Sequence, residues 1–359
     1  MIKHNQHNRY SDKAVVPSHF KRYLKFMILK NKLLISTALI GVSLGAQNTL
    51  AETKISGSAD FTYSSINGTS KANNTQGAGK EVQIDISKTT NLDNGLGFSA
   101  GFSLEQDGSE SSFDGSAGNF MEFSSGNTSI KWNIDAAASL SASAVPTAST
   151  DIETMVSGMS TTSFDWSPGG QNQFTSWNIE LAQKLDESGT VYLVYVPRIN
   201  DAGGNNDNID GSSDGTQLDF IYSGNAGIDG LNLQIGYSKA DAPSSTLQDQ
   251  KVTQLGAAYN FGKFAIGYQQ AEIDQADSTE DKQKEYGLTY SVNDNLTFGF
   301  VAATTDDNSA ENEEIRAVQL GYNLGPVTFE AYAIEIQNLA GSATAANEEK
   351  LGLRLTTQF

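Results

Sequence analysis

Cysteine is absent from the sequence, and the three histidines, His4, His7 and His19, all lie close to the N-terminus. Thiolate nucleophiles and disulfides are therefore excluded, as are Ser–His and Cys–His sites and the usual zinc ligand sets beyond residue 51. The stretch 201–215 matches part of a calcium-binding EF-hand loop, but Gln217 stands where that loop requires glutamate. The sequence therefore predicts a protein that is not an enzyme and has no cofactor or bound metal.

Long apolar runs are also scarce, and the one near the N-terminus covers only Leu33–Leu44, which is too short for a transmembrane helix. It follows Lys30 and Lys32 and precedes small residues at the positions that a signal peptidase reads, so residues 27–51 are expected to be a secretory signal peptide. An N-terminal membrane anchor is the alternative. Residues 1–26 are polar and basic, and we expect them to be an extension from an upstream start site.

Basic residues are few, with 23 Lys and Arg against 42 Asp and Glu. Removal of residues 1–51 would take away eight of these bases and one of the acids. The mature chain would then hold 15 bases and 41 acids, a formal charge of −26. Such a chain repels nucleic acid and attracts cations to any pore that it encloses.

Helical periodicity is missing after the N-terminal segment, and the 6 prolines are far fewer than the 34 glycines. Apolar and polar side chains instead alternate in short segments, as in β-strands with one apolar face. In the last of them Leu351, Leu353 and Leu355 alternate with polar residues or glycine. The sixteen segments run roughly over residues 53–64, 80–90, 96–106, 119–125, 128–134, 174–185, 190–198, 216–224, 231–239, 252–260, 263–272, 284–291, 296–304, 315–323, 327–336 and 350–359.

The connectors between these segments alternate strictly between short turns and long polar loops. Seven are tight, such as Asp93-Asn94-Gly95, and eight are long. Short turns at one end and long loops at the other are typical of outer-membrane barrels. We therefore expect an all-β fold, a 16-stranded antiparallel transmembrane β-barrel over residues 52–359, with its apolar faces toward lipid. A soluble β-sandwich or a solenoid is the alternative, because their strands also alternate.

The third long connector, residues 135–173, is the longest stretch after the signal without strand periodicity. A structureless stretch of this length within a compact domain is usually functional. We expect this constriction loop to fold into the barrel lumen and to narrow it.

The final residues, KLGLRLTTQF ending at Phe359, resemble the terminal strand by which outer-membrane barrels are recognised for assembly. Together with the opening ETKISGSADF and the sixteen segments, they make residues 52–359 resemble the general diffusion porins of Gram-negative bacteria, alphaproteobacterial type. The resemblance implies an outer-membrane location and a third external loop folded into the barrel. It also implies a homotrimer packed through the walls near both termini.

The candidate site consists of charged side chains on the constriction loop and on the strand faces expected to line the lumen. The loop acids are Asp135, Asp151, Glu153 and Asp165, and the wall bases are Lys54, Lys131, Arg198, Lys350 and Arg354. Porins of the family oppose loop acids with wall bases, and the resulting transverse field favours small polar or charged solutes. The direction of Arg198 stays open because the preceding segment is apolar on both faces. Alternatively, the acids only solvate the loop and the bases lie among lipid headgroups.

These observations predict an outer-membrane porin, a water-filled channel for passive diffusion of small hydrophilic solutes and ions, with a preference for cations. Its expected partners are outer-membrane lipid, further copies of the chain in a homotrimer and the solutes, with no nucleic acid. A structural or adhesin barrel with a plugged lumen is the alternative. An outer-membrane phospholipase or protease is disfavoured, because barrels of that kind need a histidine.

Overall fold

The computed structural model describes residues 52–68, 75–107, 119–133, 145–149, 178–199, 215–241, 249–275, 280–306, 311–338 and 347–359. All of them belong to one compact unit, residues 37–359. Both N-terminal segments predicted from the sequence, 1–26 and 27–51, lie outside the described residues. In the part of the chain that is described, no helix has the length and hydropathy needed to cross a membrane.

The described residues form sixteen strands. They are β1 Glu52–Gly68, β2 Thr75–Asn91, β3 Gly97–Asp107, β4 Phe120–Ser125, β5 Thr128–Asn133, β6 Asn178–Lys184, β7 Gly189–Ile199, β8 Gly215–Gly224, β9 Leu231–Asp241, β10 Gln250–Phe261, β11 Phe264–Gln275, β12 Glu280–Asn293, β13 Leu296–Asp306, β14 Glu313–Asn323, β15 Val327–Gln337 and β16 Glu348–Gln358.

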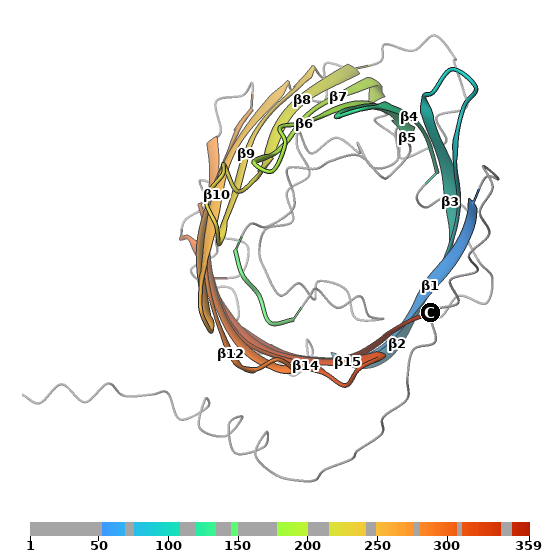
Figure 1. Cartoon of the computed structure of the whole chain (residues 1–359). Coiled ribbons are helices and arrows are strands. Elements are labelled where there is room, and N and C mark those ends of the chain that lie inside the picture. The colour runs from blue at the N-terminus through green and yellow to red at the C-terminus, as the bar shows by residue number, and fades with distance from the viewer. Residues whose placement is uncertain are drawn as a thin grey trace, which may run out of the picture. The chain divides into compact units, whose positions relative to one another are not determined.

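Each strand pairs antiparallel with its neighbours in sequence, and β1 also pairs with β16, so the sheet closes into a barrel (Figure 1). At the seam the amide of Gly57 donates to the carbonyl of Phe359 at 2.8 Å, and the amide of Phe359 donates back at 2.9 Å. The predicted 16-stranded antiparallel all-β barrel is confirmed. Predicted short turns also hold, with Gly95, Gly126 and Gly325 at positive φ, where glycine avoids the steric cost of a Cβ.

The outer face of the barrel is apolar, as the alternation predicts. On β9 the outward side chains of Ile235 and Tyr237 are 41% and 42% exposed, whereas the inward Gln234 and Ser238 are buried. Aromatic rings gather at the short-turn end, where Phe264 lies 4.8 Å from Tyr290 between ring centroids. Such a ring of aromatics is typical of the boundary between membrane and water.

Several strands extend further at their long-loop ends than the alternation predicts. The first strand reaches Gly68 rather than residue 64, the second begins at Thr75 rather than 80, and β12 begins at Glu280 rather than 284. Pairing continues there, for example between Ile66 and Thr75. Both faces carry polar residues above the apolar band, so the hydrophobic pattern fades while the backbone ladder continues.

The inner face is not polar throughout. Val194 and Val196 on β7 point inward and are fully buried. A second inward cluster on β1 and β13–β15 includes Ile66, Val301 and Ile334. The period-two pattern identifies the apolar face only where the other face is polar, and β7 is apolar on both. At Ile66 the pattern is reversed, because the outward neighbours Ser65 and Asn67 are polar.

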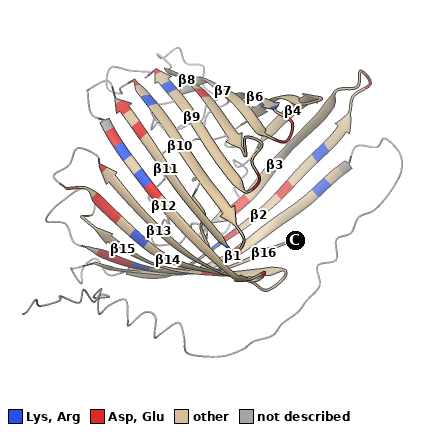
Figure 2. Ribbon diagram, turned by 60° about the vertical axis from the view of Figure 1, so that its left-hand side comes forward, with Lys and Arg blue, Asp and Glu red and all other residues tan. Residues whose placement is uncertain are grey.

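Charged residues concentrate toward the long-loop ends of β9–β13 (Figure 2). On the outer face there, Lys239 lies 2.7 Å from Asp241 and Lys282 lies 3.9 Å from Glu272, measured between nitrogen and oxygen. These exposed pairs stand above the apolar band, at the level where lipid headgroups meet water.

Candidate functional site

The inner face of the barrel is the candidate site, and strand register decides which charges it carries. Acidic side chains dominate this face. By register the inward acids are Asp60, Glu81, Asp85, Glu105, Glu122, Glu180, Asp219, Asp281, Glu285, Glu313, Glu330 and Glu348, and the inward bases are Lys54, Lys131, Lys184, Lys350 and Arg354. The described wall is therefore strongly negative, in line with the charge of the chain.

Arg354 on β16 lies between two acidic neighbours. Its guanidinium donates to Asp60 on β1, and its Nη1 lies 3.9 Å from Glu330 on β15. The Arg354 side chain is 17% exposed and that of Asp60 is 5% exposed. A charge-assisted hydrogen bond with so little access to water is stronger than a surface ion pair. Arg354 therefore also bridges the three strands around the seam.

Lys350 lies further up β16, toward the long loops. Its Cα partners are Ile66 on β1 and Ile334 on β15, both inward and buried. The Nζ atom is 3.8 Å from Glu348, and the side chain is 8% exposed. The ammonium is thus paired within an apolar surrounding rather than presented freely to the lumen.

Lys131 on β5 stands in a row of charges that crosses three strands. Its Cα partners are Glu122 on β4 and Glu180 on β6. The Nζ atom also lies 5.0 Å from the centre of the Phe120 ring, a cation–π distance. Two acids flank one base, so this part of the wall keeps a negative balance.

The other predicted site residues have different outcomes. Lys54 on β1 shares the inward face with Asp60 and is exposed. Arg198 is in β7, next to a register shift between Val196 and Ile199, and its side chain lies outside the described residues. The loop acids Asp135, Asp151, Glu153 and Asp165 lie outside them as well.

Within the predicted constriction loop the structure describes residues 145–149. They lie inside the ring, against β11–β14, where Figure 1 draws them as a short green segment. The amide of Ala148 donates to Oε1 of Gln319 on β14 at 2.8 Å. Val145 and Ser149 are buried. The rest of the loop is outside the described residues.

Sequence reasoning missed the wall acids that neutralise the predicted bases, among them Asp60, Glu330 and Glu180. The parity that selects Lys54 also selects Asp60, six positions further along the same strand. The partners of Arg354 could not be read in this way, because they come from β1 and β15 and depend on strand register.

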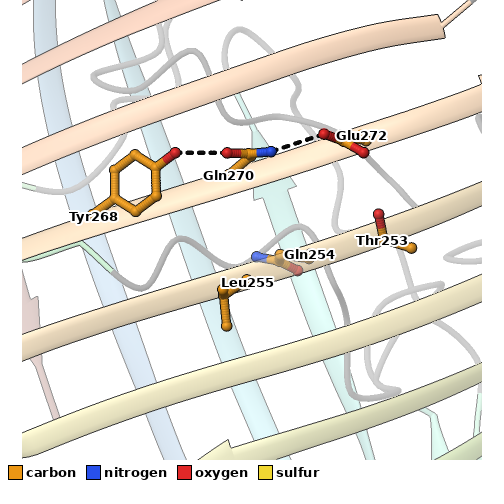
Figure 3. Close-up of a pocket in the computed structure, with 6 residues that line it drawn as sticks. All are labelled: Thr253, Gln254, Leu255, Tyr268, Gln270 and Glu272. Carbon is orange, nitrogen blue, oxygen red and sulfur yellow. Dashed lines mark hydrogen bonds between the residues drawn. The ribbon is translucent and has the colours of Figure 1, made fainter.

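A pocket of about 200 Å³ lies on the barrel wall at β10 and β11, lined by Thr253, Gln254, Leu255, Tyr268, Gln270 and Glu272 (Figure 3). On β11 the hydroxyl of Tyr268 donates to Gln270 at 2.7 Å, and the amide of Gln270 donates to Glu272 at 2.8 Å. These three side chains belong to the outward face of β11, opposite to the buried Gln269 and Ala271. They therefore do not line the lumen. In the described residues no group of histidine, cysteine, aspartate or glutamate could hold a metal ion.

Comparison with known proteins gives a family and a fold. A family model described as Gram-negative porin matches residues 36–341. Among solved structures, a mutant of Rh. blastica porin with five substitutions is 17% identical, with a TM-score of 0.58, over 86% of this chain and 100% of that chain. A second mutant of that porin, which introduces two tryptophans, is 17% identical with a TM-score of 0.59 over the same shares. No curated protein matched the chain.

Proposed function

The chain belongs to the Gram-negative porin family and resides in the outer membrane, and from this premise we propose that it forms a water-filled channel for small hydrophilic solutes that prefers cations. A barrel of sixteen strands is wide enough to leave an aqueous lumen. Passive diffusion through such a lumen needs no reacting group, and we propose no catalytic role for the chain.

The acidic excess of the inner wall is the observation that carries the cation preference. The inward acids outnumber the inward bases, and three of those bases, Lys131, Lys350 and Arg354, have acids beside them. A pore lined by charge of one sign raises the local concentration of the opposite ions. The lumen should therefore hold more cations than anions at moderate salt.

The constriction-loop acids Asp135, Asp151, Glu153 and Asp165 remain part of this proposal. They would add negative charge where the lumen is narrowest. Because Lys131, Lys350 and Arg354 are engaged by acids of the wall, the transverse field between loop and wall would be weaker than the sequence pattern suggests. We further propose that Arg198, whose side chain lies outside the described residues, contributes to that field.

The assembly and maturation of the channel are proposals too. We propose that residues 1–26 are not part of the natural product, that residues 27–51 are removed as a signal peptide, and that three copies pack through the walls near the barrel seam. The exposed apolar side chains Phe61 and Leu355 beside this seam suit either lipid or a neighbouring copy.

Reconstitution into planar bilayers tests both parts of the proposal. Under a tenfold gradient of KCl we expect stepwise conductance and a reversal potential whose sign reports preference for K⁺ over Cl⁻. A reversal potential of the opposite sign would refute the cation preference alone. If no steps appear and liposomes containing the protein fail to swell in small sugars, the lumen is plugged and the channel proposal is wrong.

A further inference from the structure

Four glycines face inward along β11–β14: Gly267, Gly287, Gly299 and Gly321. None of them has a positive φ, so no backbone conformation requires glycine there. Glycine in a strand interior weakens the strand, and it often marks a place where another backbone approaches closely. We call these four residues the glycine seat.

Register places the glycine seat on a diagonal across the inner wall. Gly267 and Gly287 are direct Cα partners on β11 and β12. Gly287 is opposite Val301 on β13, and Gly299 lies two positions from Val301 toward the short turns. Gly321 is opposite Thr297, a further two positions toward that end. From β12 to β14 the glycines therefore descend by two positions at each strand, as a segment crossing the wall obliquely would require.

Residues 145–149 occupy this diagonal. A Cβ added at Gly267 would lie 2.6 Å from Cδ of Pro146, and one at Gly287 would lie 2.7 Å from the Pro146 carbonyl oxygen. A Cβ at Gly299 would lie 2.9 Å from Cβ of Ala148, and one at Gly321 would lie 2.2 Å from the Ala148 carbonyl oxygen. Such distances are too short for van der Waals contact, so each position can be filled only by glycine unless the segment moves.

Gln319 on β14 positions residues 145–149 along the diagonal of glycines by a hydrogen bond. It is the Cα partner of Gly299, and its Oε1 accepts the hydrogen bond from the Ala148 amide. The side chain of Gln319 is fully buried, so loss of this bond would leave the amide of the half-buried Ala148 without its acceptor. Van der Waals contact with the glycines and this hydrogen bond both help to hold the segment in place.

We infer that the glycine seat positions residues 145–149 against the wall and thereby sets the width of the channel. The inference rests on the proposed channel function. A side chain at the seat would push the segment away from β11–β14 and into the lumen. The glycines thus act as positioning residues for permeation, although they carry no charge and touch no solute.

Cross-linking tests the placement without any conductance measurement. The chain has no cysteine, so a disulfide can form only between introduced residues. In the double variant Ala148→Cys with Gly299→Cys the two Cβ atoms start 2.9 Å apart, and a small shift brings them to the roughly 3.8 Å of a disulfide. We expect oxidation to change its mobility on a non-reducing gel.

The matched control pairs Ala148→Cys with Ser129→Cys, an inward position on β5, eight strands around the barrel from β13. This control should remain uncross-linked. Absence of a disulfide in the 148–299 variant, or equal cross-linking in both variants, overturns the placement. Folding of each variant is checked by its far-ultraviolet circular dichroism.

Conductance tests the consequence. Gly321→Ala adds one methyl group under the Ala148 carbonyl, and we expect a lower single-channel conductance and slower entry of the larger sugars. Ser129→Thr adds one methyl group on the opposite wall and should leave both unchanged. A Gly321→Ala conductance equal to or above that of the wild type refutes the seat's role. A wild type that does not conduct refutes the proposed function instead, while the cross-link still reports on the seat.

Discussion

At the scale of single residues, the inner wall balances its few bases locally. Arg354 is held by Asp60 and Glu330, and Lys350 by Glu348. The register of β16 places Lys350 and Arg354 on the inner face, and side-chain parity along the sequence would have found Asp60 as well. It could not predict the pairing, because β1 and β16 are adjacent only after the barrel closes, and register depends on the whole sheet.

Replacement of Arg354 by glutamine should both destabilise the barrel and sharpen its cation preference. The change leaves the buried carboxylate of Asp60 without its cation. For a fully buried pair such a loss costs about 3–5 kcal/mol, and we expect about 2 kcal/mol here because Arg354 keeps some contact with water. Urea unfolding in detergent measures the first effect and the reversal potential the second. The double variant Arg354→Gln with Asp60→Asn should recover most of the stability, and a failure to recover it would mean that the pair is not the cause.

Removal of the acids beside Lys131 should shift selectivity in the other direction. In the double variant Glu122→Gln with Glu180→Gln, Lys131 loses both flanking carboxylates, and this part of the wall changes from net negative to net positive. We expect a smaller permeability ratio of K⁺ to Cl⁻ in bilayers. Asp93→Asn, in an exposed short turn, removes a charge outside the lumen and should leave the ratio close to that of the wild type. An unchanged ratio in the double variant would falsify the role given to the wall acids.

At the scale of elements, alternation identifies the strands well and their ends poorly. All sixteen predicted segments overlap the strands of the structure, because each is long enough to show an apolar outer face. The apolar inner positions of β7, Val194 and Val196, have no counterpart in a period-two pattern. The glycine seat could not be predicted from the sequence either, because glycine is compatible with both the apolar and the polar face of a strand. Only the folded structure shows that residues 145–149 pack against these glycines.

An arginine in the middle of the lipid-facing band should be poorly tolerated. Leu288 on β12 is 42% exposed and lies between Ile266 and Phe300. For Leu288→Arg we expect a loss of about 2–4 kcal/mol, the cost of arginine near the bilayer midplane, measured by reversible unfolding in lipid vesicles. The matched variant Ser129→Arg places the same side chain toward the lumen and should cost much less. Equal costs would argue against the assignment of faces.

At the scale of the whole molecule, charge and closure are the properties that matter for function. The net charge predicted from the sequence agrees with the acidic inner wall, because most bases of the described strands lie on the outer face or near turns. Composition alone could not have placed those charges, since it does not distinguish a negative lumen from a negative outer rim.

The cation preference should weaken as salt rises. Charges on the wall act on passing ions through water, and the screening length falls from about 10 Å at 0.1 M to about 3 Å at 1 M. With the same tenfold KCl gradient, we expect a larger permeability ratio of K⁺ to Cl⁻ for 0.01 M against 0.1 M than for 0.1 M against 1 M. A ratio independent of salt would point to an ion-specific binding site rather than to the field of the wall.

The seam between β1 and β16 also bears on biogenesis and handling. The backbone amide and carbonyl of Phe359 both form hydrogen bonds with Gly57. The barrel can therefore close around its lumen only once residues 348–359 are in place. Proteolytic removal of β16 would leave β1 and β15 as edge strands with unpaired backbone N–H and C=O groups, and such edges promote self-association. An affinity tag attached after Phe359 would lie next to the pairing of β1 with β16 and could disturb it. A tag inserted in one of the long loops would avoid this pairing.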